Sequence, residues 1–438
     1  MLGSAVFRTG IAPGGALAPG WVKNELWRKA RAVPSLDLRF ADNKSLVDAV
    51  TGAQLVTFTR ASSGTFVGSD GLIQTAATNE PRFNHNPITG ESLGLLVEEA
   101  RTNNLLQSED FSSSWTSSNI AVTTNSVVAP DGTTTADTIA PPADGLTTTR
   151  FLRQNPILTT QQAYTLSVFV KVGTATTNGI NLYVSDSTAT NNFKANFNLF
   201  TLTTSPGGAG WAAPTATIVP YPNGWYRCIL TGVTSTVHVS LRAQIYLSAF
   251  STVPDTYGSI HVWGAQLEAG AFPTSYIPTT TATVTRAADV ASITGSNFSS
   301  WYNQTEGTVF FEGINPAVST TAFAVSDGST SNCLQMETGT NTRVARVVSG
   351  GTTQASNNIA YTYGASQKFA MSYVTNSINF ANAGMLGTED TSATIPTVDQ
   401  ARIGANPTGA NPLNNTIKRL TYRPTRFGGS TLQSITQP

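Results

Sequence analysis

The three histidines of the chain, His85, His238 and His261, do not form a metal-binding motif. Their separations lack the short spacing with which histidines bind zinc. His238 and His261 lie in strand-like patterns, where a place in the core or on the surface is the usual role. The sequence contains no nucleophile elbow, phosphate-binding glycine loop or zinc signature. We therefore expect no metal, no cofactor and no catalytic histidine.

Carboxylates occur in two adjacent pairs, Glu98 with Glu99 and Glu109 with Asp110. Glycoside hydrolysis requires two carboxylates that face each other across a cleft. Neighbouring residues of an extended chain point to opposite sides, so neither pair converges. We predict that the protein is not an enzyme. A polysaccharide depolymerase, with carboxylates from distant parts of the chain, is the least favoured alternative.

The two cysteines, Cys228 and Cys333, are 105 positions apart. A fold built on disulfides shows more cysteines at closer spacing, so no disulfide is expected between them. Cys228 lies in a strand-like run that begins at Trp225, where a free thiol acts as a small buried apolar group.

The composition excludes several kinds of partner. Charged residues make up 11% of the 438 residues, against roughly 25% in an average soluble protein. The net charge is +0 and the basic residues are scattered, so we expect no nucleic-acid binding. No apolar stretch reaches the length of about 18 residues that spans a bilayer, so we expect no membrane insertion. Uncharged polar, strand-rich sequence is typical of extracellular or particle-borne proteins.

The chain is organised around residues 223–278, which are predicted to form core strands whose ends are marked by turn residues and prolines. An Asn-Gly pair before Trp225 predicts a tight turn, and prolines after Glu268 stop strand pairing. Within residues 260–267 the side chains alternate between two faces. One face is predicted to carry His261, Trp263, Ala265 and Leu267, and the other Ile260, Val262, Gly264 and Gln266.

Short strands separated by turns recur along most of the chain, which predicts an all-β fold of tandem antiparallel β-sandwiches. The pattern is most regular over residues 105–286, which favours a jelly roll. Residues 287–438 form a second sandwich that ends in a short helix or turn at 430–435. Residues 36–104 are expected to form a small β region, and residues 1–35 a separate N-terminal arm with a short helix.

The N-terminal arm contains Trp21, Leu26 and Trp27 in a short helix candidate that is flanked by glycine and proline. Two tryptophans within eleven residues, after a flexible apolar stretch, suggest a segment that docks on another protein. The alternative is a helix that packs on its own first domain.

Three blocks of the sequence resemble virion proteins of tailed bacteriophages. The first is LLVEEARTN at 95–103, and the second combines NGWYR at 223–227 with VWGAQLEAG at 262–270 and PTSYIP at 273–278. This second block resembles the carbohydrate-binding-module-like jelly roll of phage fibre and minor structural proteins. The third block consists of residues 307–312, 368–373, 417–426 and 432–433 of the C-terminal domain, and it resembles a concanavalin A-like, laminin G-like sandwich.

The resemblance implies a virion structural protein, a tail or head fibre, located at the particle surface. Such proteins are commonly homo-oligomers, with a trimer favoured here, and they attach to host-surface glycans. The N-terminal arm would then bind other virion proteins through Trp21, Leu26 and Trp27. The alternative within this class is a capsid decoration or adaptor protein that contacts only other virion proteins.

Sugar binding by such sandwiches uses flat aromatic rings that stack on the apolar face of a pyranose. Trp225 and Trp263 lie in apolar strands and are predicted to be core residues. Trp211 follows a Pro-Gly-Gly stretch that reads as a loop, so we expect its ring to be exposed and to bind carbohydrate. Trp115 and Tyr302 lie near predicted domain edges and are the other carbohydrate-binding candidates.

Overall fold

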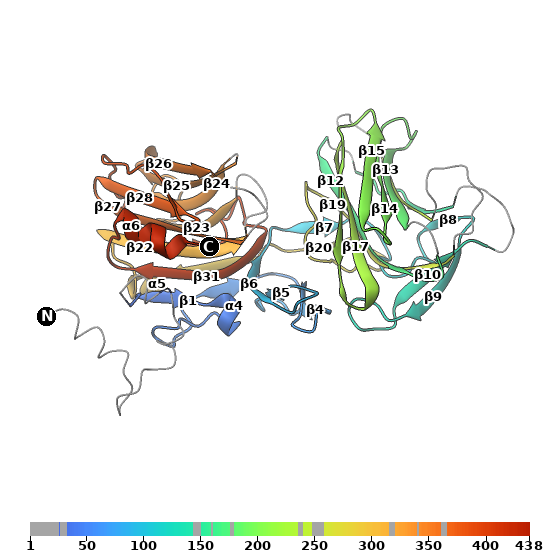
Figure 1. Cartoon of the computed structure of the whole chain (residues 1–438), viewed down its shortest axis with the longest axis horizontal. Coiled ribbons are helices and arrows are strands. Elements are labelled where there is room, and N and C mark those ends of the chain that lie inside the picture. The colour runs from blue at the N-terminus through green and yellow to red at the C-terminus, as the bar shows by residue number, and fades with distance from the viewer. Residues whose placement is uncertain are drawn as a thin grey trace, which may run out of the picture. The chain divides into compact units, whose positions relative to one another are not determined.

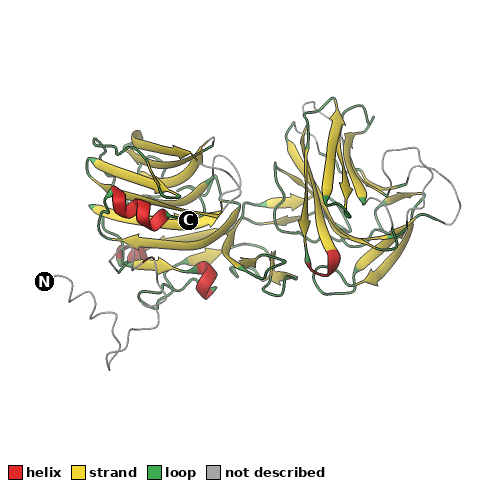
Figure 2. Cartoon of the chain, viewed as in Figure 1, coloured by secondary structure: helices red, strands yellow, loops and turns green. Residues whose placement is uncertain are grey.

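The structure is a computed structural model that describes residues 26, 33–142, 150–158, 161–175, 179–234, 240–247, 258–314, 320–339, 341–360 and 366–438. The chain divides into two compact units, in each of which antiparallel sheets are stacked (Figures 1 and 2). The prediction of an all-β fold with tandem antiparallel β-sandwiches is therefore confirmed. No helix among these residues is both long and apolar enough to cross a membrane.

The jelly-roll unit comprises Ala61–Glu91 and Ala100–Ala288. Its first sheet has the order β16 (Thr215–Pro220), β17 (Trp225–Val233), β12 (Ala163–Val172), β19 (Ile260–Ala269), β10 (Ala136–Ala140) and β9 (Ala121–Val127). Its second sheet has the order β15 (Thr203–Ala209), β14 (Asn192–Asn198), β13 (Ile180–Asp186), β18 (Leu241–Tyr246), β11 (Phe151–Gln154) and β8 (Thr116–Ser118). Smaller pairs are β3 (Gly64–Val67) with β4 (Ile73–Ala76), and β7 (Arg101–Asn103) with β20 (Val284–Arg286).

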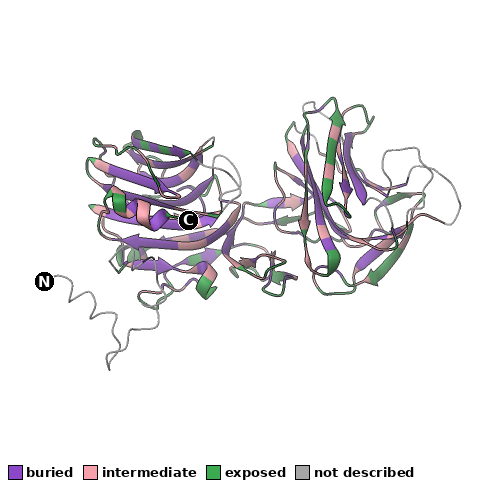
Figure 3. Ribbon diagram, viewed as in Figure 1, coloured by how far each residue is buried: buried purple, intermediate pink, exposed green. Residues whose placement is uncertain are grey.

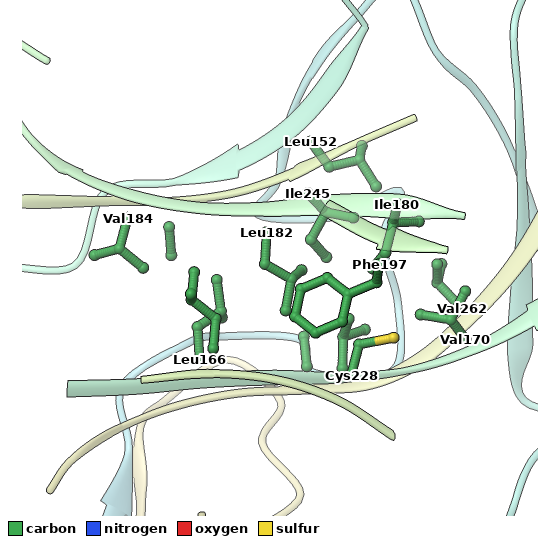
Figure 4. Close-up of a cluster of buried hydrophobic side chains, with 14 of the residues drawn as sticks. Leu152, Leu166, Val170, Ile180, Leu182, Val184, Phe197, Cys228, Ile245 and Val262 are labelled. Atoms are coloured by element: carbon green, nitrogen blue, oxygen red, sulfur yellow. The ribbon is translucent and has the colours of Figure 1, made fainter. Parts of the chain in front are cut away.

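The core of the jelly-roll unit lies between its two sheets. Leu166 and Cys228 of the first sheet face Leu182, Val184 and Ile245 of the second (Figure 4). Every second residue of β13 and β18 points into this core, because successive side chains of a strand point to opposite faces. The residues between them are therefore on the outer face of the second sheet.

The C-terminal unit comprises Met1–Arg60, Ser92–Glu99 and Asp289–Pro438. One sheet has the order β29 (Met385–Leu386), β28 (Ser377–Asn382), β27 (Ser366–Val374), β22 (Glu306–Ile314), β31 (Asn415–Arg423) and β6 (Ser92–Val97), with β1 (Leu36–Leu38) also on β31. The other has the order β2 (Thr57–Thr59), β21 (Val290–Thr294), β30 (Gln400–Ile403), β23 (Thr321–Ser326), β24 (Cys333–Gly339), β25 (Thr342–Ser349) and β26 (Thr352–Ala360). The helices are α4 (Phe40–Asn43), α5 (Gly295–Ser299) and α6 (Gly429–Thr436).

Residues 36–104 are shared between the two units, which differs from the small separate β region expected from the sequence. β1 pairs with β31, where Leu36 lies opposite Tyr422, and β6 pairs with the same strand. Residues 61–91 belong to the jelly-roll unit instead. The local pattern predicts strands here but not their partners, because the partner strand β31 lies more than 300 residues further along the chain.

A β-bulge at Gly264 reverses the alternation predicted for β19. Ser167 of β12 lies opposite Gln266 and Phe169 lies opposite Trp263, so two residues of β19 face the single residue Val168. Gly264 has a φ of +63°, which glycine adopts at low cost. As a result Ile260, Val262, Ala265 and Leu267 all point into the core, whereas the sequence placed them on opposite faces.

The bulge also places Gln266 and Glu268 on the outer side of the first sheet, where they hold residues 274–277. The Glu268 carboxylate accepts hydrogen bonds from the backbone N–H and the hydroxyl of Thr274, at 2.9 and 2.7 Å. Gln266 Oε1 accepts one from the backbone N–H of Ile277 at 2.7 Å. The PTSYIP block therefore crosses the outer side of the sheet in a fixed position.

Tyr276 of this crossing segment belongs to an aromatic cluster on the outer side of the first sheet. Trp225, Trp263 and Tyr276 are almost fully buried, and Phe169 contacts Trp263 edge-to-face at 5.5 Å. The prediction that Trp225 and Trp263 are core residues is confirmed. By contrast, the edge strand β9 is largely exposed (Figure 3).

Candidate functional site

The outer face of the second sheet of the jelly-roll unit brings aromatic, cationic and amide side chains together. We call it the aromatic–cationic face. It consists of Phe151, Arg153, Asn181, Tyr183, Lys194, Arg242, Gln244 and Tyr246. Each of these residues alternates with neighbours that point into the core, so all of them project to the opposite side of the sheet.

Strand register arranges these side chains in two rows across the sheet. In one row Phe151 of β11 lies opposite Tyr246 of β18, which lies opposite Asn181 of β13. In the second row Arg153 of β11 lies opposite Gln244 of β18. Gln244 lies opposite Tyr183 of β13, which in turn lies opposite Lys194 of β14. Neighbouring strands in a sheet are about 4.8 Å apart, so members of a row are in reach of one ligand.

Three aromatic rings form the centre of the aromatic–cationic face. Phe151 and Tyr246 are half-buried, whereas Tyr183 is only 9% exposed and the amides Asn181 and Gln244 are buried. The ring centroids of Phe151 and Tyr246 are 5.4 Å apart, and those of Tyr183 and Tyr246 are 5.9 Å apart. Burial raises the pKa of both tyrosine hydroxyls. The Tyr246 hydroxyl accepts a hydrogen bond from Gln244 Nε2 at 2.6 Å, which fixes its position.

Cationic side chains flank the rings. The Arg153 guanidinium lies 5.5 Å from the centroid of the Phe151 ring, and its buried Nε has no hydrogen-bond partner among the described residues. Arg242 of β18 lies opposite Ser185 of β13, in the row next to that of Tyr183 and Gln244. Neither Arg153 nor Arg242 forms an ion pair with a carboxylate in the part of the chain that the structure describes.

This combination has the chemistry needed to bind a sugar. Aromatic rings offer apolar surface to the C–H groups of a pyranose, and amides and guanidinium groups offer directed hydrogen bonds to its hydroxyls. The rigid sheet holds all of these groups in one plane, which lowers the entropic cost of binding. The aromatic–cationic face is therefore the candidate binding site.

The expectation that Trp211 presents an exposed ring is wrong. Trp211 is only 7% exposed and packs in the core against Phe193, with ring centroids 5.8 Å apart. Residues that read as a loop before it form β15, whose position at the edge of the sheet tolerates Pro206. Trp211 therefore has no free face on which a sugar can stack.

The other two carbohydrate candidates also lie in packed surroundings. Trp115 is 7% exposed, lies 5.1 Å from Phe111 and donates a hydrogen bond to the backbone carbonyl of Gln107. Tyr302 is half-buried in the C-terminal unit and stacks on Phe298 at 4.6 Å. The structure does not bring these residues together with Trp211 on one surface of the jelly-roll unit, because Tyr302 belongs to the other unit.

The predicted anchoring residues are mostly outside the described part of the chain. Trp21 and Trp27 are outside the described residues, whereas Leu26 is helical and 8% exposed. Leu26 packs with Phe310 and with Leu432 and Ile435 of α6. For Leu26 this is the alternative of a helix that packs on its own domain.

Both cysteines are free and buried, and the burial of Cys228 confirms the prediction for that residue. Burial raises the pKa of the Cys333 thiol to about 12. No group of three or more potential metal ligands occurs in the described ranges. His85 and His261 lie in the jelly-roll unit, where His261 Nδ1 is 2.9 Å from the Thr138 hydroxyl; His238 is outside the described residues.

The jelly-roll unit also has a small cavity, away from the aromatic–cationic face. Its volume is about 80 Å³, and Ser63, Thr75, Ile277 and Thr285 contribute to its lining. Pockets for drug-sized ligands measure about 300–1,000 Å³. This cavity is therefore too small to hold a sugar chain.

No family model and no curated protein matches the sequence. Among solved structures, the chain is similar to the CBM40 domain of a Ruminococcus gnavus IT-sialidase, with 13% identity, a TM-score of 0.28, and coverage of 31% of this chain and 84% of that chain. It is also similar to domains LG4-5 of the mouse laminin α1 chain, with 10% identity, a TM-score of 0.22, and coverage of 75% and 88%.

A tail fibre protein of an E. coli phage is a further similar structure, with 8% identity and a TM-score of 0.24. The similarity covers 72% of this chain and 40% of that chain. These similarities carry no role over to this chain.

Proposed function

We propose that this chain is a virion-borne attachment protein whose jelly-roll unit binds host-surface glycans. The observation that carries the proposal is the cross-strand arrangement of Phe151, Tyr246 and Tyr183, flanked by Arg153 and Gln244, on one outer face of a sheet. The rings of Phe151 and Tyr246 are the accessible part of this arrangement, because Tyr183 is only 9% exposed.

The face fits an extended glycan better than a small molecule in a pocket. Its rows run across β11, β18, β13 and β14, so a glycan that stacks on Phe151 and Tyr246 also comes within reach of cationic side chains on the neighbouring strands. Phe151 and Tyr246 are half-buried, which leaves part of each ring open for contact.

The virion part of the proposal rests on the sequence. The low charge content and the blocks at 95–103 and 223–278 support a phage particle protein. In this proposal the N-terminal arm binds other virion proteins, and the chain assembles as a homo-oligomer, with a trimer favoured. Several copies on one particle would increase the avidity for a repeated surface glycan.

A glycan array probed with the full chain tests the proposal. We expect binding, and we expect Phe151→Ala to lower it about tenfold or more because a stacking surface is lost. Phe272→Ala is the matched control, because Phe272 is also half-buried in the jelly-roll unit and also lies under an arginine, Arg101, at 4.9 Å. It should bind like the unchanged protein.

Two outcomes would contradict the proposal. The first is an absence of binding to any glycan, which favours a decoration or adaptor protein that contacts only virion proteins. The second is an equal loss of binding in the Phe151 and Phe272 variants, which indicates a general effect on folding.

A further inference from the structure

We infer that the aromatic–cationic face selects anionic sugars, those that bear a carboxylate or a sulfate, over neutral ones. This inference rests on the proposed function and names the class of glycan that the same face binds. It follows from the charges on the face and from what surrounds them.

The face gathers cations in a chain that has no excess of them. Lys and Arg total 25 and Asp and Glu also total 25 over the whole sequence. Arg153, Lys194 and Arg242 nevertheless project from the same side of one sheet. They lie on β11, β14 and β18, within a group of four adjacent strands that also includes β13. A local cluster of one sign attracts ligands of the opposite sign and raises their association rate.

The carboxylate closest to these cations in the strand pattern is already held by its own loop. Asp186 ends β13, and its oxygens accept hydrogen bonds from Thr188, Thr190 and Asn191 at 2.8–3.1 Å. It forms no ion pair with Arg242, although Arg242 lies opposite the preceding residue, Ser185. Asp186 keeps its negative charge but forms no ion pair with Arg153 or Arg242, so both guanidinium groups are left to pair with a ligand.

The two arginines are placed to hold an anion beside the rings. The Arg153 guanidinium lies 5.5 Å from the centroid of the Phe151 ring, and the charges of Arg242 and Asp186 both act on Tyr183. An arginine presents parallel N–H groups that match a carboxylate, and such charge-assisted bonds are about twice as strong as neutral ones.

Arginine stems can also cover apolar surface without binding a ligand. That role does not depend on the charge of a ligand, whereas anion recognition does. A comparison of ligands that differ only in charge therefore distinguishes the two roles.

The test uses the full chain and matched pairs of sugars. Oligosaccharides that contain galacturonic, glucuronic or sialic acid are each compared with their carboxyl-reduced, neutral counterparts, and a sulfated galactose oligosaccharide forms a second arm. We expect at least one acidic sugar to bind roughly ten- to a hundredfold more tightly than its reduced partner. Binding should weaken with added salt because exposed charges are screened. Preference for the sulfated arm supports selection by charge, and preference for the carboxylated arm supports selection by carboxylate geometry.

Substitutions test whether the preference for acidic sugars arises from the aromatic–cationic face. Arg242→Gln should lower affinity for the acidic sugar about tenfold and leave affinity for the neutral partner within about twofold. Lys171→Gln is the control, because Lys171 lies on the first sheet of the same unit, and it should change neither affinity. Circular dichroism and unfolding temperature confirm that each variant is folded.

The possible failures are distinguishable. Equal affinity for acidic and neutral partners overturns this inference but leaves the proposed function intact. An equal loss of both affinities in Arg242→Gln also overturns it, because the arginine would then act only on the structure of the face. If no sugar of either kind binds, both the inference and the proposed function fail.

Discussion

Glu268 and Thr274, six residues apart, are joined by two hydrogen bonds in which the backbone N–H and the hydroxyl of Thr274 donate to the Glu268 carboxylate. Glu268 is fully buried and also accepts a hydrogen bond from Gln266 at 2.7 Å. These hydrogen bonds hold residues 274–277, which follow β19, in a fixed position across the outer side of the first sheet.

We predict that Glu268→Ala destabilises the jelly-roll unit. Three buried donors would lose their acceptor, which costs about 3 kcal/mol. Urea unfolding followed by tryptophan fluorescence measures the change. Thr217→Ala, an exposed change in β16 of the same sheet, should stay within about 0.5 kcal/mol. An unchanged unfolding midpoint for Glu268→Ala would show that the network contributes nothing.

Gly264→Ala should also destabilise this unit, by about 1–3 kcal/mol. The φ of +63° disfavours a side chain, and an added Cβ would lie 3.0 Å from the Phe169 ring and 3.3 Å from Tyr276. Gly207→Ala is the control, because no atom lies within 4 Å of its added Cβ. Thermal unfolding of both variants checks the prediction, and similar midpoints would argue against the bulge.

Trp211→Ala should lower stability rather than act on binding alone. The ring is buried between the sheets, and removal of a buried tryptophan costs about 3–5 kcal/mol. Phe200→Ala, at a position that is 51% exposed in the neighbouring turn, should have little effect. Calorimetry would measure both. A Trp211 variant that melts like the unchanged protein but loses sugar binding would restore the ligand role expected from the sequence.

Asp37→Asn should weaken the C-terminal unit in a pH-dependent way. Asp37 is buried; burial alone would raise its pKa, but the bidentate contact with Arg419 and the contact with Arg39 outweigh burial and lower it. A lowered pKa means that the charged form stabilises the fold above the ordinary value of 3.8 and that this stability is lost as pH falls through the folded-state pKa.

The variant should therefore lose about 3 kcal/mol at pH 7, and the difference should narrow below about pH 4. Unfolding by urea across this range measures it. Asp42→Asn, at an exposed position in α4, should show neither the loss nor the pH dependence. A difference that is constant with pH would contradict the role of the Asp37 charge.

Substitutions in the N-terminal arm should have two different effects, one on stability at Leu26 and one on docking at Trp21 and Trp27. Leu26→Ala should destabilise the C-terminal unit by about 2 kcal/mol because it leaves a gap beside Leu432 and Ile435. Combined replacement of Trp21 and Trp27 by alanine should leave unfolding unchanged and reduce incorporation into particles. Normal incorporation of that double variant would contradict the anchoring role.

The residue pattern alone predicts the strand class, the approximate position of most strands and the burial of Trp225 and Trp263. These features depend on local alternation, and β17 begins at Trp225, where the sequence predicts a strand to begin. The C-terminal helix α6 also lies where the sequence predicts it. The period of side-chain direction along a strand is a local property, so one segment of sequence is enough to show it.

The candidate site was not predictable in the same way. Its residues come from β11, β13, β14 and β18, and no two of these strands are consecutive along the chain except β13 and β14. The polar residues of β14, such as Asn196 and Asn198, hide its strand pattern. Each residue looks ordinary in its own strand, and only the register between strands places Phe151, Tyr246 and Tyr183 together.

Residues 223–278 show the same division within one stretch. Their alternation, their turn at Asn223 and the prolines beyond Glu268 indicate two core strands without any knowledge of the fold. Which side chains enter the core depends on the bulge at Gly264. At this bulge two residues of β19 lie opposite a single residue of β12. That choice depends on a neighbouring strand about a hundred residues earlier in the chain, so it arises only when the sheet forms.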